Sequence, residues 1–203
     1  MENFTKKELA LFKSLNTPRK IQEFITKIPI NFEPYGETCL SPRMVLQQNR
    51  AHCIEAAMLA ATILRKHGHR PLLLDLEACP PDDSHVVALF KQHGYWGAIS
   101  KTNHAVLRYR DPIYKTIREL ALSYFHEYFD KKGKKTLRAY AIVDLSKYDK
   151  KGWMTADEDQ WDINNSLFEL PHHQILNRKQ IALLKKPDKI EMKYGDLVEW
   201  KRE

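Results

Sequence analysis

The chain has 203 residues, 43% of them hydrophobic and 29% charged, which allows one globular domain with its own core and excludes disorder as the main state. Its longest nearly apolar stretch, residues 56–64, is about half of the roughly 20 residues that cross a bilayer, and residues 1–7 lack the apolar region of a signal peptide. The net charge of +7 arises almost entirely in residues 131–151, which carry eight Lys and Arg against two Asp, so nucleic acid is not the expected partner. We therefore expect a soluble cytoplasmic protein with no membrane-spanning segment.

The N-terminal flank, residues 1–44, is expected to be helical and then irregular. Apolar side chains recur every three or four positions over residues 5–28, and a Thr-Pro step at 17–18 divides this pattern into two helices. Residues 31–42 contain two prolines and a glycine, which is typical of a turn-rich segment.

The central region, residues 45–130, is expected to form a helix and an antiparallel sheet. Residues 54–67 are helical by composition and apolar almost all round, which indicates a helix enclosed by other elements, with a glycine directly after it. The short apolar run at 72–78 indicates a buried strand. Two further strands, 85–90 and 95–99, flank a short glycine-containing turn and predict an antiparallel hairpin.

The remaining segments complete what we expect to be a single domain, residues 1–203, with residues 131–203 as a C-terminal flank of strands and loops. The local patterns predict an extended piece at 105–109, a helix at 114–129, a strand at 136–145, an irregular polar segment at 146–165, a helix within 171–184 and a terminal hairpin at 189–200.

Three cysteines, Cys39, Cys53 and Cys79, form an odd set with no C-x-x-C spacing. This pattern argues against a disulfide framework and against a cysteine-based zinc site, so we expect free thiols. The nine histidines form no H-E-x-x-H motif or other ligand spacing with a carboxylate base. We therefore expect neither a metal nor a cofactor.

Cys53 stands at the start of the enclosed helix, where unpaired N–H groups and the helix dipole favour the thiolate over the thiol. A helix N-terminus and a nearby imidazolium are the two effects that lower a thiol pKa most. His85 opens a strand after the helix and one intervening strand, so the fold can return it to Cys53. The pair predicts a nucleophile and its base, although a small core cysteine and a structural histidine give the same local pattern.

Five short segments carry a wider pattern: R-A-H-C-I-E-A-A at 50–57, L-R-K-H-G-H at 64–69, the strand at 71–76, D-S-H-V-V-A at 83–88 and G-Y-W-G-A-I-S at 94–100. In this order they resemble the transglutaminase-like branch of the papain-like thiol enzymes, over about residues 45–112. The resemblance implies an α+β fold whose papain-like core packs a central helix on an antiparallel sheet. It also implies that Cys53 is the nucleophile and His85 the base, with an Asp or Asn on the neighbouring strand to orient the histidine.

The third member of the triad departs from the family pattern. A hairpin centred on residues 92–93 places Ser100 opposite His85, where the family usually has Asp. A serine hydroxyl can accept the imidazole N–H but adds no charge to stabilise the imidazolium. Asn103 and Asp111 are the alternatives, and an Asp before Pro is also a common turn former.

An oxyanion needs donors, and the backbone N–H of Cys53 is one candidate. The side chain of Gln47 or Gln48, upstream of the nucleophile, is expected to be either a second donor or simply solvated. Glu55 lies in the first turn, where a carboxylate is favourable to the helix dipole, and we assign it no catalytic role.

These residues predict an enzyme that cleaves or transfers an amide or acyl group through a covalent acyl-enzyme, with a peptide, a protein or a small-molecule amide as substrate. Hydrolysis is favoured over cross-linking because water is always available and no D-x-[DN]-x-[DN]-G calcium loop is present. The missing acidic orienter favours an alternative, a degenerate core that serves as a binding module. A third reading is a basic adaptor that binds nucleic acid through residues 131–151.

Overall fold

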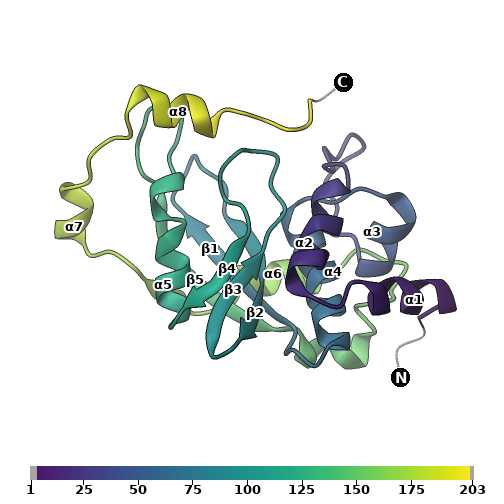
Figure 1. The fold of residues 1–203 in the computed structure, drawn as a ribbon. Helices are drawn as coiled ribbons and strands as arrows, with labels where there is room; N and C mark the ends of the chain where they lie inside the picture. The colour runs from purple at the N-terminus through teal and green to yellow at the C-terminus, as the bar shows by residue number, and fades with distance from the viewer. Residues whose placement is uncertain (1–3, 202–203) are drawn as a thin grey trace.

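The computed structural model describes residues 4–201, and within them six strands form one antiparallel sheet in the order β4-β3-β2-β1-β5-β6 (Figure 1). The strands are β1 (Leu72–Ala78), β2 (His85–Gln92), β3 (Tyr95–Ile99), β4 (Arg110–Tyr114), β5 (Leu137–Asp144) and β6 (His173–Gln174). The α-helices are α1 (Lys6–Ser14), α2 (Pro18–Lys27), α3 (Pro42–Gln48), α4 (Cys53–Lys66), α5 (Ile117–Ser123), α6 (Trp161–Glu169), α7 (Arg178–Ala182) and α8 (Lys189–Gly195). This mixed architecture with an antiparallel sheet confirms the expected α+β class.

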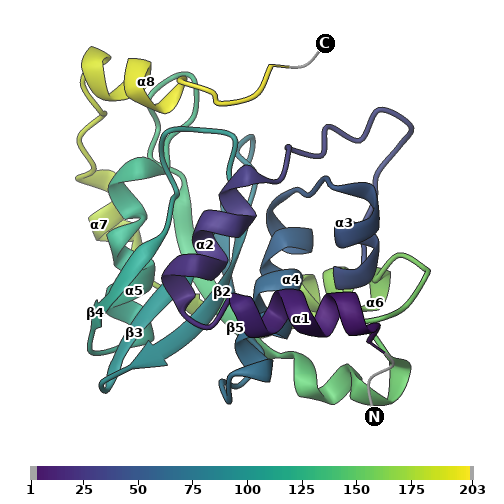
Figure 2. The same ribbon diagram turned by 45° about the vertical axis from the view of Figure 1, so that its right-hand side comes forward.

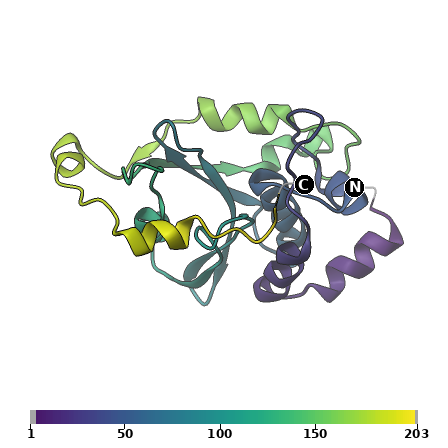
Figure 3. The same cartoon turned by 90° about the horizontal axis from the view of Figure 1, so that it is seen from above.

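Helices cover both faces of the sheet. Successive side chains of a strand point to opposite faces, and here both faces carry apolar side chains that pack against helices. On one face, Leu73, Val86 and Ala88 belong to the same apolar cluster as α4 and the buried side chains of α1 to α3. On the other face, Leu74 and Val87 pack with the apolar side of α5. Figure 2 shows α1 to α4 grouped on one side of the strands and α5 on the other, and Figure 3 shows the same division from above.

The helix α4 is enclosed, as its composition predicts. Every residue from Ile54 to Leu64 is buried, and Gly68, with φ of +86°, lets the chain turn into β1. Two backbone bonds that join Ala51 to Pro29 and Asn31 fix the approach to its N-terminus. Cys53 is consequently held as the first residue of the helix, with His52 as the N-cap.

The turn between β2 and β3 differs from the expected one. Gln92 pairs with Tyr95, so the turn consists of His93 and Gly94, whose φ values of 48° and 87° suit a two-residue turn with two left-handed positions. The expected centre at residues 92–93 was wrong by one position. His85 therefore lies diagonal to Ser100 and not directly opposite it.

The helices and strands predicted at 5–28, 54–67, 72–78, 85–90, 95–99 and 136–145 are confirmed with small shifts of their ends. Three other predictions were wrong. The extended piece at 105–109 is irregular, and the strand is β4, an edge strand that tolerates Pro112 because one side of its backbone is unpaired. The segment 146–165 contains a 3₁₀-helix (Leu145–Lys151) and α6, and the expected hairpin at 189–200 is α8.

The helix expected at 114–129 is present but shorter, because it consists of α5 and a 3₁₀-helix (Phe125–Glu127). The helix α3 was not predicted. A helix does lie within 171–184, as α7. The short helices share strong N-terminal caps: the carboxylate of Glu191, for example, accepts the backbone N–H of Asp188 at the start of α8.

The basic segment 131–151 does not form one free charged surface. Lys135 is buried, with its ammonium 2.7 Å from Nδ1 of His126, and Lys151 pairs with Asp162. Its centre is β5, which pairs with β1 inside the sheet. In the described part of the chain, no helix has the length and apolar character to cross a bilayer.

Candidate active site

Cys53 lies in a cleft of about 470 Å³ between the N-terminus of α4, one face of the sheet and α6. The first turn of α4 contributes His52, Cys53 and Ile54, and β1 contributes Asp75, Glu77 and Ala78. The loop before β2, Val86, one side of α6 and His172 complete the walls. The cleft therefore gathers three separate stretches of the chain, within residues 52–54, 75–86 and 164–172.

Cys53 is half-buried as a residue, and its thiol is strongly acidified. Burial by itself raises its pKa, but hydrogen-bonding and charge interactions with the imidazoles of His52 and His85 outweigh this effect and lower the pKa to about 5. Cys39 shows the opposite behaviour, because burial beside Glu55 and Asp159 raises the pKa of its thiol to about 12. All three cysteines are free, and of these two only Cys53 is a thiolate at neutral pH.

His85 is buried at the start of β2, and its Nε2 lies 2.8 Å from Oγ of Ser100. The Ser100 hydroxyl donates its own proton to the carbonyl oxygen of Leu107 at 2.5 Å. Oγ must then accept from Nε2–H, which leaves Nδ1 of His85 as the ring nitrogen for the Cys53 thiol. Ser100 therefore contacts His85 although the two residues are diagonal neighbours in the hairpin. The hairpin register alone does not require this hydrogen bond.

The two alternatives for the third position lie elsewhere. The side-chain amide of Asn103 donates to the carbonyl oxygen of Trp200 and accepts from its N–H, so it ties the C-terminal segment to the core. Asp111 is exposed on the edge strand β4. Neither residue lines the cleft that holds Cys53.

The glutamine candidates for the oxyanion are also placed away from the cleft walls. Gln47 and Gln48 are exposed at the end of α3, and Oε1 of Gln48 accepts two bonds from the guanidinium of Arg50. Of the two roles expected for these glutamines, oxyanion donor or solvated side chain, their positions correspond to the second. The first-turn N–H groups of α4, at Cys53 and the residues after it, are the donors that the cleft itself offers, because they have no partners within the helix.

His52 is a second imidazole beside Cys53, and the sequence patterns did not predict a role for it at this site. Its Nε2 lies 3.0 Å from the carbonyl oxygen of Thr38, 3.4 Å from Glu55 and 3.6 Å from Glu33. Burial lowers the pKa of His52, but interactions with Cys53, Glu55 and the Thr38 carbonyl outweigh it and raise the pKa to about 9. His52 is therefore an imidazolium beside the thiolate.

Glu55 is fully buried, and it holds this end of α4 together. Its carboxylate accepts the backbone N–H groups of Leu40 and His52, each at 2.9 Å, and the Thr38 hydroxyl at 2.7 Å. The amide of Asn31 donates to it at 3.1 Å. Glu55 thus anchors the loop before α3 against the helix start, a role beyond the dipole effect expected of it.

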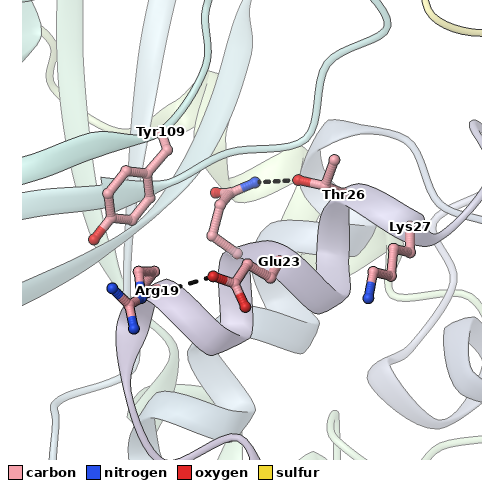
Figure 4. A pocket seen from close by; sticks show the side chains of 6 residues that line it. Arg19, Glu23, Thr26, Lys27 and Tyr109 are labelled. Carbon is pink, nitrogen blue, oxygen red and sulfur yellow. Dashed lines mark hydrogen bonds and ion pairs between the residues drawn. The ribbon is translucent and has the colours of Figure 1, made fainter.

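Gln22 of α2 holds the backbone of Ser100, whereas His85 contacts its hydroxyl. Its amide donates to the Ser100 carbonyl oxygen at 2.8 Å and accepts the Ser100 N–H at 2.9 Å. Gln22 also donates to the hydroxyl of Thr26, in a shallow groove beside Tyr109 that Figure 4 shows from close by. Gln22 is a positioning residue because it touches Ser100 and not the thiol.

We expect Gln22→Ala to slow alkylation of Cys53 by iodoacetamide at pH 6 by about threefold, because a displaced Ser100 no longer orients the His85 ring. Gln22→Glu retains the acceptor for the Ser100 N–H and is expected to recover part of the rate. Glu23→Gln, a neighbouring exposed position on α2, is the matched control. Equal rates in Gln22→Ala and Glu23→Gln, measured by mass spectrometry of Cys53, contradict the positioning role.

Across residues 4–201, His, Cys, Asp and Glu side chains nowhere gather in a group of three or more arranged to hold a metal ion. The comparisons with known proteins add no relative: the chain matches no protein-family model, and no curated protein is significantly similar to it.

Proposed function

We propose that the protein is a thiol enzyme with a transglutaminase-like, papain-like core that hydrolyses an amide or related acyl bond through Cys53. The observation that carries the proposal is the coincidence of three features at one point: a partly exposed cysteine at a helix N-terminus, a thiol pKa of about 5, and the hydrogen-bonded pair of His85 and Ser100. Acidified thiols of this kind occur in reactive sites, whereas structural cysteines stay protonated.

The chemistry follows from these positions. The Cys53 thiolate attacks the acyl carbon to form a C–S bond, and the carbonyl electrons move to the oxygen, which the first-turn N–H groups of α4 stabilise. Collapse breaks the bond to the leaving amine, which takes a proton from the His85 imidazolium and leaves a thioester. Water then gives a proton to His85 and attacks the thioester, which releases the acid and restores the thiolate and imidazolium.

A limiting amount of iodoacetamide at pH 6 tests the proposal. An ordinary thiol with a pKa near 8.5 is almost wholly protonated there, so we expect Cys53 to be labelled about 100-fold faster than Cys79. His85→Ala is expected to slow the labelling of Cys53 about tenfold. His93→Asn, which replaces an exposed histidine in the hairpin turn by a residue that tolerates its positive φ, is the control for folding and for general histidine effects.

A second candidate is a catalytically degenerate binding module. The observation that favours it is the neutral hydroxyl of Ser100 at the place of an acidic orienter, which supplies no charge to the His85 imidazolium. The same experiment separates the two, because the binding module predicts that Cys53 is labelled no faster than Cys79. That outcome contradicts the enzyme.

A further inference from the structure

The cleft around Cys53 is acidic in a basic protein. The chain carries 33 Lys and Arg residues, yet among the described residues none of them lines this cleft. Four carboxylates do line it, from Asp75 and Glu77 on β1 and from Asp82 and Asp83 in the loop before β2. Charges that line a cleft act on a bound group more strongly than the distant net charge of +7, because the protein walls exclude the solvent that screens them.

Asp75 offers an unused acceptor in the wall of the cleft. The residue is only 6% exposed in the middle of β1, and its Oδ2 lies 2.9 Å from Nε2 of His172. Within residues 4–201 no protein donor bonds to Oδ1, and this oxygen is not one of the fully buried polar atoms without a partner, so it is accessible from the cleft that Asp75 lines. Such an oxygen is free to accept an N–H or O–H bond from a ligand.

His172, the hydrogen-bond partner of Asp75, determines whether Asp75 contributes to the negative charge of the cleft. Nδ1 of His172 is 2.8 Å from the carbonyl oxygen of Leu170, so both ring nitrogens face acceptors. The pair of Asp75 and His172 must then contain the additional proton, on either partner, and is neutral as a unit. The imidazolium of His52 likewise offsets the thiolate of Cys53, and the protonated His85 of the proposed mechanism adds one positive charge beside them.

The three carboxylates of Glu77, Asp82 and Asp83 outnumber the single positive charge of protonated His85, so the remaining charge is negative. Asp82 accepts a hydrogen bond from the hydroxyl of Thr136. Glu77 lies two residues after Asp75 along β1 and lines the same cleft. The walls therefore combine an N–H acceptor at Asp75 with uncompensated negative charge beside it.

We propose that this cleft selects acyl substrates that carry a protonated amine or a guanidinium group near the bond to be cleaved. Asp75 accepts N–H bonds from that cation, and Glu77, Asp82 and Asp83 balance its charge. The inference rests on the proposed function in that Cys53 is the nucleophile, and it names the substrate class of the same site.

Three methanethiosulfonate reagents of similar size but different charge test the proposal on the full chain. Each forms a disulfide with the Cys53 thiolate and releases methanesulfinate, so no acyl chemistry is needed. With rates normalised to those of mercaptoethanol, we expect the trimethylammonium reagent to exceed the sulfonate reagent by about tenfold at low salt, and the difference to shrink in 1 M salt, roughly, where the screening length is about 3 Å.

Glu77→Gln is expected to reduce this preference about threefold, because it removes one charge from the cleft wall. Asp111→Asn removes one exposed charge on β4 and is expected to leave the preference unchanged. A normalised ratio near one overturns the inference even where the neutral reagent reacts quickly, in which case the proposed function stands. Slow reaction with all three reagents contradicts the proposed function, while their ratio still reports the charge of the cleft.

Protection experiments identify the source of the cation. We expect millimolar lysinamide, roughly, to slow labelling by the neutral reagent if the substrate is a small molecule, and tetralysine alone to slow it if the substrate is a polypeptide. Asp75→Asn is expected to weaken the protection about tenfold, because the charge-assisted bond to the ammonium is lost. Absence of protection by both compounds overturns the inference.

Discussion

We expect the alkylation rate of Cys53 to rise with pH along a titration curve centred near 5 and to stay high through neutral pH. His52→Gln removes one of the two imidazoles that lower the thiol pKa, so the midpoint of the curve moves toward that of an ordinary thiol, and the rate at pH 6 falls by about tenfold or more. The measurement is the rate of iodoacetamide labelling of Cys53 between pH 4 and pH 9, roughly, with peptide mass spectrometry as readout.

His67→Gln is the matched control for this variant. His67 caps the other end of α4 and bonds the carbonyl oxygen of Phe12 at 2.9 Å, so its removal changes the helix but not the surroundings of the thiol. We expect the titration midpoint of Cys53 to be the same in His67→Gln and in the unchanged protein. A midpoint that stays near 5 in His52→Gln shows that His85 and the helix N-terminus suffice without His52.

The Cys53 thiol and the His52 imidazole have opposite effects on how the stability of the fold depends on pH. The folded thiol of Cys53 titrates near 5, below its unfolded value of about 8.5, so its contribution is present above pH 8.5 and is lost as pH falls through 5. The folded imidazole of His52 titrates near 9, above its unfolded value of about 6.5, so its contribution is present below pH 6.5 and is lost as pH rises through 9. Between about 6.5 and 8.5, folding moves a proton from thiol to imidazole, and the pair leaves the denaturation midpoint independent of pH.

We expect Glu55→Ala to lower the free energy of unfolding by about 3–5 kcal/mol. The substitution leaves the N–H groups of Leu40 and His52 and the side chains of Asn31 and Thr38 without their shared acceptor, a carboxylate that is itself fully buried. Urea denaturation followed by circular dichroism measures the change. Because the same carboxylate faces His52, the variant is also expected to label more slowly at Cys53.

Glu119→Ala is the control for Glu55→Ala. Glu119 occupies the same third position of a capping box in α5, but its side chain is exposed, so its loss is expected to cost only about 0.5–1 kcal/mol. The difference between the two variants isolates the cost of the buried donors from the cost of the cap. Equal destabilisation contradicts the anchoring role of Glu55.

Local sequence patterns are sufficient where one periodicity dominates. Three parts of the fold are recognisable in this way: the apolar run of α4, the short apolar strand β1 and the strands of the β2–β3 hairpin. Elements that are buried on all sides, or on alternate sides, need apolar residues at regular positions along the chain. The wrong predictions lie where the pattern is weak: α8 is only seven residues long and buries none of them, and α6 follows a polar, acidic stretch. There, capping and tertiary packing decide between helix, strand and loop.

The candidate site divides along the same line. The sequence alone predicts a cysteine at a helix start, a histidine at a strand start and a serine within reach of it, because these depend on element order and on the length of one hairpin. It does not predict that the carboxylate of Glu55 is buried, that His52 becomes an imidazolium or that Asp75 meets His172, 97 positions away in the chain. Such contacts depend on how the sheet, α4 and α6 pack in three dimensions, and no local periodicity records a partner that is distant along the chain.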